Sequence, residues 1–335
     1  MIETDICIVG AGPAGLFAVF EAGLQDMRCH LVDALPYVGG QLAELYPEKP
    51  IYDIPGFPAV IAGDLIRNLQ AQIAPFKPGF TLGERVETLL PVEGGGFVVR
   101  TNLGTEIRAK VVAIAGGLGS FEPRKPNLPR LDYFEGRGVD YMVRQAEKYR
   151  GKRVVIGGGG DSALDWAVYL ADYTAGLSLV HRRDEFRGAP DTAAKVAALA
   201  EAGKLTLYLS AQLAGIDGGD HLESVTITTR EGEQVALPAD FLIPLYGLTP
   251  KLGPIEQWGL HLDKRNIAVS VEDYSTNIPG VFAIGDINTY PGKLKLILCG
   301  FHEAAIMAHA AIKYVYPDKK AGPIKYTTVT GIAGF

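Results

Sequence analysis

Two glycine-rich segments of this 335-residue chain have the spacing of a phosphate-binding turn. Each follows a short apolar run and precedes a stretch with helical periodicity. Glycine lets backbone N–H groups approach an anion closely, and the N-terminus of the following helix adds partial positive charge. The spacing therefore predicts two dinucleotide sites. Their residues are Gly10, Gly12, Ala14 and Gly15 in the first segment, and Gly158, Gly159, Gly160, Asp161 and Ser162 in the second.

The two segments differ at the position where such sites distinguish a ribose 2′-hydroxyl from a 2′-phosphate. The residue 23 positions after the first glycine is Asp33 in the first segment and His181 in the second. A carboxylate accepts hydrogen bonds from a hydroxyl but repels a phosphate by about 1–4 kcal/mol at contact distance. Arginine pairs with phosphate in a planar, charge-assisted geometry, and Arg182, Arg183 and Arg187 follow His181. We expect a 2′-hydroxyl nucleotide at the first site, NADP(H) at the second, and electron transfer between them.

The elements expected around these residues form two strand–helix–strand units. A helix from about Pro13 to Leu24 follows the first glycine segment, and one from Ser162 to about Ala171 follows the second. Ser162 is placed to cap that helix and to contact phosphate. The other expected elements are strands at 111–115, 177–180, 205–209, 225–229, 241–246 and 281–284, and helices at 64–76 and 302–314.

A carboxylate stands at the end of one of the later strands. Gly285 and Asp286 follow the apolar strand 281–284 and precede the C-terminal helix. At this turn Asp286 is placed to hold a ribityl hydroxyl of FAD, close to the positive end of the helix. We therefore assign the first dinucleotide site to FAD.

The expected fold is α/β, with two Rossmann-like dinucleotide-binding domains. The FAD-binding domain is discontinuous and comprises residues 1–117 and 248–335, and the NADP(H)-binding domain, 118–247, is inserted into it. The chain crosses between the domains near Gly116–Gly117 and near Gly247. We expect these two crossings to form a double hinge.

Composition excludes several other classes of function. A net charge of −6 gives no basic character for nucleic acid or an anionic membrane. The sequence contains no run of eighteen or more apolar residues, which a helix across a bilayer would need. The first strand begins too early to leave room for a signal peptide, so we expect a cytoplasmic protein. Cys7, Cys29 and Cys299 include no C-x-x-C pair, so neither a metal site nor a redox dithiol is expected. We expect Cys7 and Cys29 to be buried hydrophobic residues rather than a disulfide.

Several motifs resemble those of the thioredoxin reductase superfamily. They are the first glycine segment and residues 39–42, 159–163, 181–183 and 278–286. That superfamily has a C-x-x-C dithiol shortly before the second glycine motif, whereas the corresponding stretch here, 138–143, contains no cysteine. The chain therefore lacks the dithiol that relays electrons to a disulfide in thioredoxin reductases.

The resemblance is closer to the ferredoxin–NADP⁺ reductases of the thioredoxin-reductase-like type. It runs over nearly the whole chain, with matching motifs at 45–49, 51–57, 161–166 and 252–260. It implies a homodimer with FAD and NADPH domains that moves electrons between NADPH and a ferredoxin or flavodoxin. Alternatives with the same cofactor motifs are an NADPH-dependent flavin or quinone reductase (a diaphorase) and a non-catalytic flavin redox sensor.

The resemblance also implies site residues, position by position. Tyr46 falls where an aromatic ring stacks on the isoalloxazine, and Tyr326, near the C-terminus, is the candidate that covers the other flavin face. These two rings are expected to lie closest to hydride transfer. The further FAD contacts implied by the family are Asp33, Gln41, Val86, Phe121, Asp286 and Thr327.

Ferredoxins are usually acidic, so a ferredoxin would need a local basic patch on this acidic chain. Two groups of cations are candidates for that patch, and solvated surface side chains are an equally good explanation of both. The groups are Lys148, Arg150 and Lys152, and Arg124 and Lys125.

Overall fold

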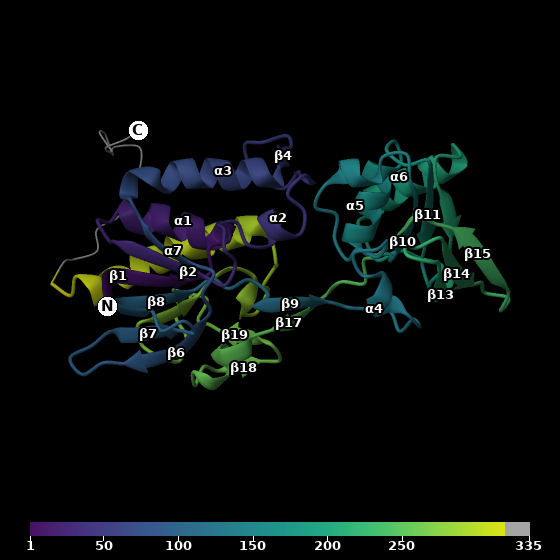
Figure 1. Ribbon diagram of the computed structural model, residues 1–335. Helices are drawn as coiled ribbons and strands as arrows, with labels where there is room; N and C mark the ends of the chain where they lie inside the picture. Colours follow the sequence, from purple (N-terminus) through teal and green to yellow (C-terminus); the bar gives the residue numbers. More distant parts are fainter. Residues whose placement is uncertain (319–335) are drawn as a thin grey trace. The chain divides into compact units, whose positions relative to one another are not determined.

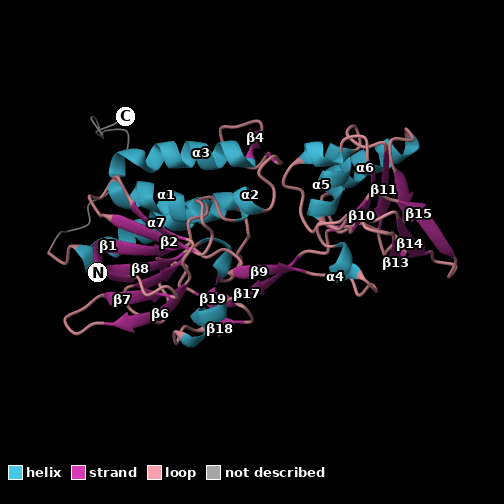
Figure 2. Cartoon of the chain, viewed as in Figure 1, coloured by secondary structure: helices cyan, strands magenta, loops and turns pink. Residues whose placement is uncertain are grey.

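The chain folds into two compact units, which Figure 1 shows in a computed structural model. The structure describes residues 1–318, without the side chains at 120–122 and 248–250. The first unit comprises Met1–Ser120 and the chain from Pro250 onward, and the second comprises Phe121–Thr249. The expected crossings at residues 117 and 247 lie within three residues of these boundaries. Both units combine helices with parallel strands (Figure 2), as the expected α/β class requires.

The first unit is built on a mixed β-sheet. Its strands are β1 (Ile2–Val9), β2 (Cys29–Asp33), β5 (Gly79–Leu82), β6 (Val86–Pro91), β7 (Phe97–Thr101), β8 (Glu106–Ile114) and β20 (Val281–Ala283). They run in the order β5-β2-β1-β8-β7-β6, with β20 also paired to β8. The pairs among β5, β2, β1, β8 and β20 are parallel, and those that involve β6 or β7 are antiparallel.

The central strands of this sheet are buried on both faces. Ile6 and Ile8 of β1 pack with the helices α1 (Pro13–Gly23), α3 (Ala62–Ile73) and α7 (Ile297–Val315). Cys7, between them in the strand, packs in a separate core with Val112 and Ile267. Alternation along a strand sends neighbouring side chains to opposite faces. A near-continuous apolar run such as β1 is therefore what a covered parallel strand needs.

Helix α7 is longer than the sequence predicts. The expected start at residue 302 was wrong by five residues, because the helix begins at Ile297. Gly300, which would weaken an isolated helix, packs closely on two other parts of the unit. A Cβ on Gly300 would lie 3.2 Å from Ala14 Cβ and 3.5 Å from Gly285 Cα. Tertiary packing, rather than local propensity, therefore stabilises the first turns of α7.

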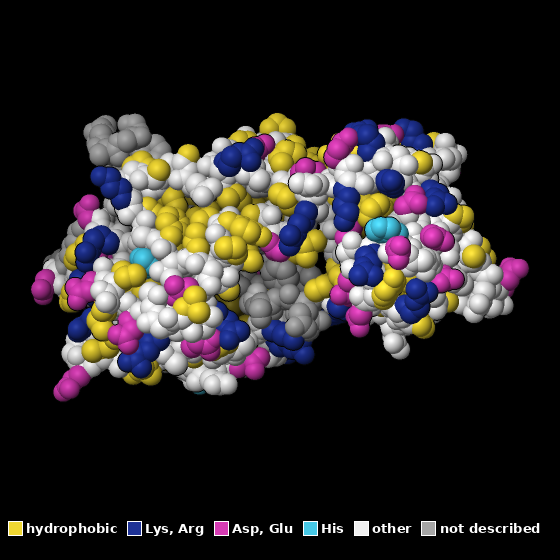
Figure 3. Space-filling view, in the orientation of Figure 1, with side chains coloured by type: hydrophobic (Ala, Val, Ile, Leu, Met, Phe, Trp, Pro, Cys, Tyr) yellow, Lys and Arg dark blue, Asp and Glu magenta, His cyan; other side chains and the backbone are white. Residues whose placement is uncertain are grey.

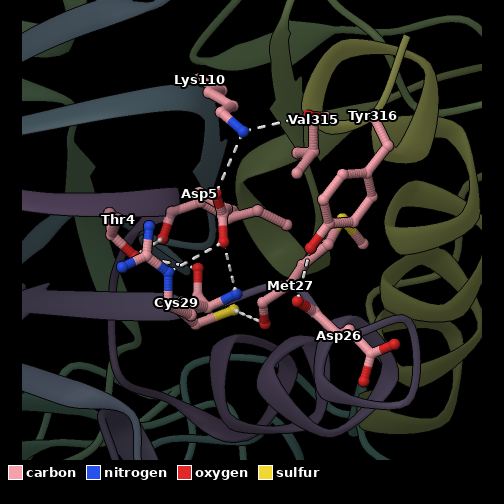
Figure 4. A network of polar contacts seen from close by, with 10 residues as sticks. Thr4, Asp5, Asp26, Met27, Cys29, Lys110, Val315 and Tyr316 are labelled. Carbon is pink, nitrogen blue, oxygen red and sulfur yellow. Dashed lines mark hydrogen bonds and ion pairs between the residues drawn. The ribbon is translucent and has the colours of Figure 1, made fainter. Parts of the chain in front are cut away.

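A polar network joins the amino end of β1 to the end of α7 (Figure 4). Asp5, almost buried in β1, has its Oδ1 3.4 Å from Lys110 Nζ. Lys110 Nζ also donates to Val315 O at 3.0 Å, and Tyr316 OH donates to Asp26 O at 2.6 Å. These contacts attach the last turn of α7 to the end of the sheet that lies opposite the glycine turn.

Shorter elements complete the first unit, and the Pro-, Gly- and Tyr-rich segment after β2 contains three of them. In that segment they are α2 (Gln41–Glu44) and the antiparallel pair β3 (Pro50–Ile51) and β4 (Val60–Ile61). The other short elements of the unit are η1 (Ala74–Phe76), η3 (Gly253–Gln257) and η4 (Gly285–Ile287). A small sheet of β18 (Leu262–Asp263), β19 (Asn266–Ala268) and β21 (Asn288–Thr289) lies beside η4, because β21 follows that 3-10 turn directly.

The second unit contains a parallel sheet and a smaller antiparallel one. The parallel sheet has the order β12 (Thr206–Tyr208), β11 (Gly176–Val180), β10 (Arg153–Gly157) and β16 (Phe241–Pro244). Its helical elements are α4 (Leu131–Phe134), η2 (Ala146–Tyr149), α5 (Asp161–Leu170) and α6 (Pro190–Glu201). The antiparallel sheet comprises β13 (Gln212–Asp217), β14 (Ser224–Thr228) and β15 (Gln234–Pro238).

The two chain segments that connect the units pair with each other as strands, β9 (Ser120–Pro123) and β17 (Leu248–Lys251). Gly117 and Gly247, just before each strand, have φ values of +59° and +88°. Such values favour glycine. The double hinge at these crossings stays a prediction.

Three expectations about composition can be compared with the structure. Cys7 and Cys29 are buried and, like Cys299, are free thiols, which confirms the expectation for the first two. Within residues 1–318, no group of His, Cys, Asp and Glu side chains has the arrangement of a metal site. In the same range, no helix has both the length and the apolar composition needed to cross a membrane.

Candidate nucleotide-binding sites

The first glycine turn joins β1 to α1 with very close backbone packing. Gly10 has a φ of +115°, and a Cβ there would lie only 2.3 Å from Ala115 O. A Cβ on Gly15 would lie 2.2 Å from Gly10 O, so the first turn of α1 comes this close to Gly10 only because Gly15 lacks a side chain. Gly12 is different, since the nearest atom to a Cβ there would be Gly40 Cα at 4.0 Å. The space in front of Gly12 is open to an anion.

Gly10→Ala is expected to lower the free energy of unfolding by about 1–3 kcal/mol, because the added methyl group overlaps Ala115 O. Gly219→Ala is the matched control, since a Cβ there would have only Glu223 Oε1 nearby, at 3.8 Å. Urea unfolding of both variants measures the difference. Equal midpoints and slopes for the two variants would contradict the close packing of this turn.

The segment before α2 lies against the first glycine turn. Gly40, with a φ of +56°, approaches so closely that a Cβ on it would lie 3.1 Å from Gly12 Cα. Gln41 follows as the first residue of α2. A Cβ on Gly117, three residues after the end of β8, would lie 3.1 Å from Gln41 Nε2. The structure therefore brings Gln41 to the carboxyl end of the sheet, next to the turn.

Asp33, the last residue of β2, fixes the first glycine turn through both carboxylate oxygens. Oδ2 accepts the Ala11 N–H at 2.7 Å, and Oδ1 accepts the Leu35 N–H at 2.9 Å. Burial raises the pKa of Asp33, and the two backbone donors act in the opposite direction. Each carboxylate oxygen has a further lone pair. Asp33 can therefore hold the turn and accept a ribose hydroxyl as well.

Asp286 and Tyr46 reach the same end of the sheet. Gly285 has a φ of +76°, and a Cβ on it would lie 3.2 Å from Ala14 Cβ, so the turn before Asp286 packs directly on α1. Burial, followed by the carboxylates of Asp286 and Asp53, raises the pKa of Tyr46 to about 12. Burial also raises the pKa of Asp286. The turn that carries Asp286 thus packs on α1 beside the first glycine turn, and Tyr46 is close enough to Asp286 for that carboxylate to affect its pKa.

Four other predicted FAD residues are not brought to this group by the described contacts. Val86 begins β6, and its side chain is buried in the core, so only its backbone is available to a ligand. Phe121 lies in β9, where the side chains are not described. Tyr326 and Thr327 lie outside the described residues. These assignments stay predictions.

A buried ion pair beneath Gly285 was missed by the sequence analysis. Glu303 of α7 is fully buried, and it accepts hydrogen bonds from Gly285 N–H at 2.6 Å and from Asn288 Nδ2 and Tyr290 OH, each at 2.9 Å. It also pairs with the ammonium of Lys293, which donates to Gly285 O at 3.0 Å. The pair therefore holds both backbone groups of Gly285. Its signal in the sequence is a carboxylate within the apolar periodicity of a helix.

The second glycine turn joins β10 to α5. A Cβ on Gly158 would lie 2.7 Å from Ala163 Cβ, and one on Gly159 would overlap the His181 ring at 2.2 Å. Gly160 has nothing within 4 Å of an added Cβ, and it is the N-cap of α5. The first two glycines therefore allow close packing, and the third faces open space at a helix N-terminus, where an anion is favoured.

The His181 ring packs against Gly159 of the second turn and does not point into that open space. Its ring is buried, its Nε2 lies 3.0 Å from Glu185 O, and burial lowers its pKa. The Arg187 N–H donates to Gly159 O at 2.8 Å. The segment after β11 therefore folds back onto the glycine turn and carries its arginines with it.

Helix α5 begins differently from the prediction. Its N-cap is Gly160, and no side chain caps the helix, so the expected Ser162 cap is wrong. Gly160 has extended backbone angles at the end of the tight turn, which starts the helix at Asp161, one residue before Ser162. Ser162 is exposed on the first turn. Asp161 Oδ1 instead accepts the Ala189 N–H at 2.8 Å, which ties the folded-back segment to the helix start.

Three exposed guanidinium groups surround this turn, those of Arg182, Arg183 and Arg187. Within residues 1–318, none of them forms an ion pair with a carboxylate. Their charges help to lower the pKa of His181, so they lie close to its ring. Guanidinium groups without carboxylate partners, next to an open helix N-terminus, form a site for a strongly anionic group.

The chain matches a known protein family over most of its length. The family described as pyridine nucleotide-disulphide oxidoreductase matches residues 4–310, which include both glycine turns. The chain belongs to the pyridine nucleotide-disulphide oxidoreductase family.

Relatives of this oxidoreductase carry a more specific name. It is 59% identical to the ferredoxin–NADP reductase of Flavobacterium johnsoniae, over 100% of this chain and 95% of the relative. It is 52% identical to the ferredoxin–NADP reductase of Parvibaculum lavamentivorans, over 98% of this chain and 95% of the relative. The expected resemblance to the ferredoxin–NADP⁺ reductases is confirmed.

Solved structures identify the fold of this oxidoreductase. The crystal structure of thioredoxin reductase from Lactococcus lactis has a TM-score of 0.80 and 24% sequence identity, and covers 94% of this chain and 99% of its own. The thioredoxin reductase of T. acidophilum has the same TM-score at 23% identity, with coverage of 95% and 99%. The expected architecture of two dinucleotide-binding domains is therefore confirmed.

Proposed function

We propose that this chain is an FAD-dependent oxidoreductase that transfers electrons between NADPH and a ferredoxin. The observation that carries the proposal is the difference between its two dinucleotide turns. The Asp33 carboxylate closes the first turn, and beside the second lie three exposed arginines that pair with no carboxylate in the described part of the chain. Relatives named ferredoxin–NADP reductase, at 59% and 52% identity, support NADPH and ferredoxin as the electron partners.

The first unit fits FAD. Gly12 and the N-terminus of α1 would bind the pyrophosphate, because the space in front of Gly12 is open. Asp33 would accept the ribose hydroxyl, Asp286 would hold the ribityl chain, and the Tyr46 ring would lie beside the isoalloxazine. Four further residues are assigned to FAD on family resemblance alone: Val86, Phe121, Tyr326 and Thr327. Gln41 is assigned to FAD on the same resemblance and also because it lies next to the first turn.

The second unit fits NADPH. Gly160, open on its free side, would receive the pyrophosphate at the start of α5, with the exposed Ser162 as a further donor. Arg182, Arg183 and Arg187 would bind the 2′-phosphate. His181 would act indirectly, because its buried ring supports Gly159.

FAD, when bound, supplies the exchange between a two-electron hydride and single electrons. What the chain's own residues contribute is positioning and the exclusion of water, and no general base is required. The phenol of Tyr46 has a pKa of about 12, so it stays neutral at physiological pH and adds no charge beside the flavin. Its half-buried ring covers the site with an apolar surface.

No thiol relay is needed between the flavin and the acceptor. Burial raises the pKa of Cys7 to about 12 and also raises that of Cys29, so neither thiol is reactive at neutral pH. Residues 138–143, which correspond to the stretch that carries the dithiol in thioredoxin reductases, contain no cysteine. Electrons would therefore pass from the flavin directly to a separate acceptor protein.

The decisive experiment combines a visible spectrum of the purified protein with steady-state turnover. We expect a flavin spectrum, faster reduction by NADPH than by NADH, and a higher kcat/KM for ferredoxin than for quinones or dyes. Preferred reduction of quinones would favour a diaphorase, and negligible turnover with every acceptor would favour a redox sensor. A colourless protein that takes up no flavin would overturn the proposal.

We also propose that the protein is a cytoplasmic homodimer and that flavodoxin can replace ferredoxin. Hydrophobic side chains gather on the face of the first unit that carries α1, α2 and α7 (Figure 3). Two of these helices carry the half-buried aromatic residues Phe17 (α1) and Phe301 (α7), whose ring centroids lie 4.9 Å apart. An exposed apolar face of this kind is suited to a partner subunit. Sedimentation equilibrium distinguishes a dimer from a monomer.

A further inference from the structure

We propose that the acidic ferredoxin docks on a flavin-side basic surface of the first unit. This surface consists of Lys264 and Arg265, at the turn between β18 and β19, and Lys295, with the exposed side chains of Leu262 and Leu294. The inference rests on the proposed function, because it names the surface that would bring the one-electron acceptor to the FAD site.

The turn between β18 and β19 lies next to the turn that carries Asp286. β19 and β21 pair in parallel, with Ile267 opposite Asn288. β19 also contacts η4, the 3-10 turn that contains Asp286, and Arg265 directly precedes β19. The cations at this turn are therefore close to a residue that would hold FAD.

The segment between β21 and α7 carries the third cation. Lys295 Nζ donates to Asn266 Oδ1 at 2.8 Å, which joins this segment to β19. Lys295 also lowers the pKa of Asp286, against the dominant effect of burial, so its charge acts at the same turn. Lys264, Arg265 and Lys295 thus form one surface, although 30 residues separate the two segments.

The charge of this surface is opposite to that of the whole chain. The stretches 262–268 and 291–298 contain one acidic residue, Asp263. Lys293, in the second stretch, is buried against Glu303 and contributes no exposed charge. Lys264, Arg265 and Lys295 are all exposed. On a chain with a net charge of −6, such a local reversal is what an acidic partner needs for orientation and rapid association.

The surface also has apolar groups that a docked protein can cover. Leu294 is 60% exposed and Leu262 is 37% exposed. Transient interfaces of electron-transfer proteins are small, and they combine an apolar centre with a charged rim. Leucines between cations fit that pattern, so the surface offers contact area as well as charge.

The cations of the second unit are a weaker alternative because most of them are already paired. Lys148 lies 2.7 Å from Asp140, and Lys125 lies 2.5 Å from Glu135. Arg150 pairs with Glu147. A paired side chain presents little net charge to an approaching protein.

The test is a double charge reversal, Lys264→Glu with Arg265→Glu. Its kcat/KM for ferredoxin is measured at low ionic strength, with either NADPH or reduced ferredoxin as the electron donor. We expect kcat/KM for ferredoxin to fall at least tenfold and the loss to shrink at high salt, because screening weakens the charge effect. NADPH-driven reduction of ferricyanide should stay unchanged. Leu294→Ser should lower ferredoxin kcat/KM with little salt dependence, and this second variant tests the same surface without changing charge.

Two control variants separate the outcomes. Arg108→Glu changes an exposed cation near the amino end of β8, away from the carboxyl end that carries the first glycine turn, and should leave ferredoxin turnover unchanged. Lys148→Glu with Lys152→Glu tests the second unit. If that pair lowers ferredoxin kcat/KM more than the Lys264 and Arg265 reversal, or if the reversal has less than a twofold effect, the docking surface is wrong. If the wild-type protein reduces dyes but not ferredoxin, the proposed function fails instead.

Discussion

Glu303→Ala should lower the free energy of unfolding by about 3–5 kcal/mol and leave most of the purified protein without FAD. The substitution strips the buried ammonium of Lys293 of its counterion, and a buried charge without a partner costs about that much. It also removes the acceptor for the N–H of Gly285. Because Gly285 directly precedes Asp286, the loss reaches the FAD site as well as the core. Urea unfolding and the ratio of FAD to protein absorbance measure the two effects.

A second variant separates the two roles of Glu303. Glu303→Met combined with Lys293→Met removes both buried charges, and apolar replacements of a buried ion pair are often neutral for stability. We expect this variant to recover most of the lost free energy of unfolding. Its FAD affinity should stay low, because Gly285 N–H and O both lose the partners that fix the turn.

The matched control is Glu256→Ala, an exposed glutamate of the same unit. It should change neither the free energy of unfolding nor FAD content measurably. Should Glu303→Ala behave like this control, the ion pair does not hold the turn. Recovery of both stability and FAD binding in the double Met variant would mean that Glu303 only neutralises Lys293. The hydrogen bonds to Gly285 would then not be needed for FAD binding.

The parts of the site that the sequence predicts are those encoded by local spacing. A glycine turn needs particular residues within six positions, so Gly10, Gly12 and Gly15 are recognisable without a structure. The distance to Asp33 is fixed by one helix and one strand, and the structure places its carboxylate on the Ala11 N–H. Regular elements carry residues over known distances, which is why these expectations hold.

The parts that the sequence does not predict depend on packing between distant segments. Glu303 and Lys293 meet because an irregular segment folds back over the first turns of α7, and no periodicity describes that path. The direction of the His181 ring is likewise set by the space under Gly159. A motif can name a residue such as His181, but only the packing decides whether its side chain faces the ligand or the core.

Arg182→Ala combined with Arg183→Ala should lower kcat/KM for NADPH about 100-fold and leave kcat/KM for NADH within twofold of wild type. A hydrogen bond to a charged group contributes about 1.5–3 kcal/mol, and each 1.4 kcal/mol corresponds to a factor of ten. Two such bonds at the lower end of that range give about 3 kcal/mol, and solvent screening of these exposed arginines keeps the combined effect at about that value. Only NADPH carries the 2′-phosphate, so the two nucleotides isolate that contact. Stopped-flow reduction of the flavin by each nucleotide gives the ratio.

Arg230→Ala is the matched control for this specificity, since Arg230 is an exposed arginine at the turn between β14 and β15. It should leave the NADPH-to-NADH ratio unchanged, whereas the Arg182 and Arg183 variant should bring the ratio towards one. A parallel loss with both nucleotides would place the arginines at the pyrophosphate instead, next to Gly160. An unchanged ratio would mean that neither Arg182 nor Arg183 binds the 2′-phosphate. Arg187 would then be the remaining cation of the turn, and its backbone N–H already donates to Gly159 O.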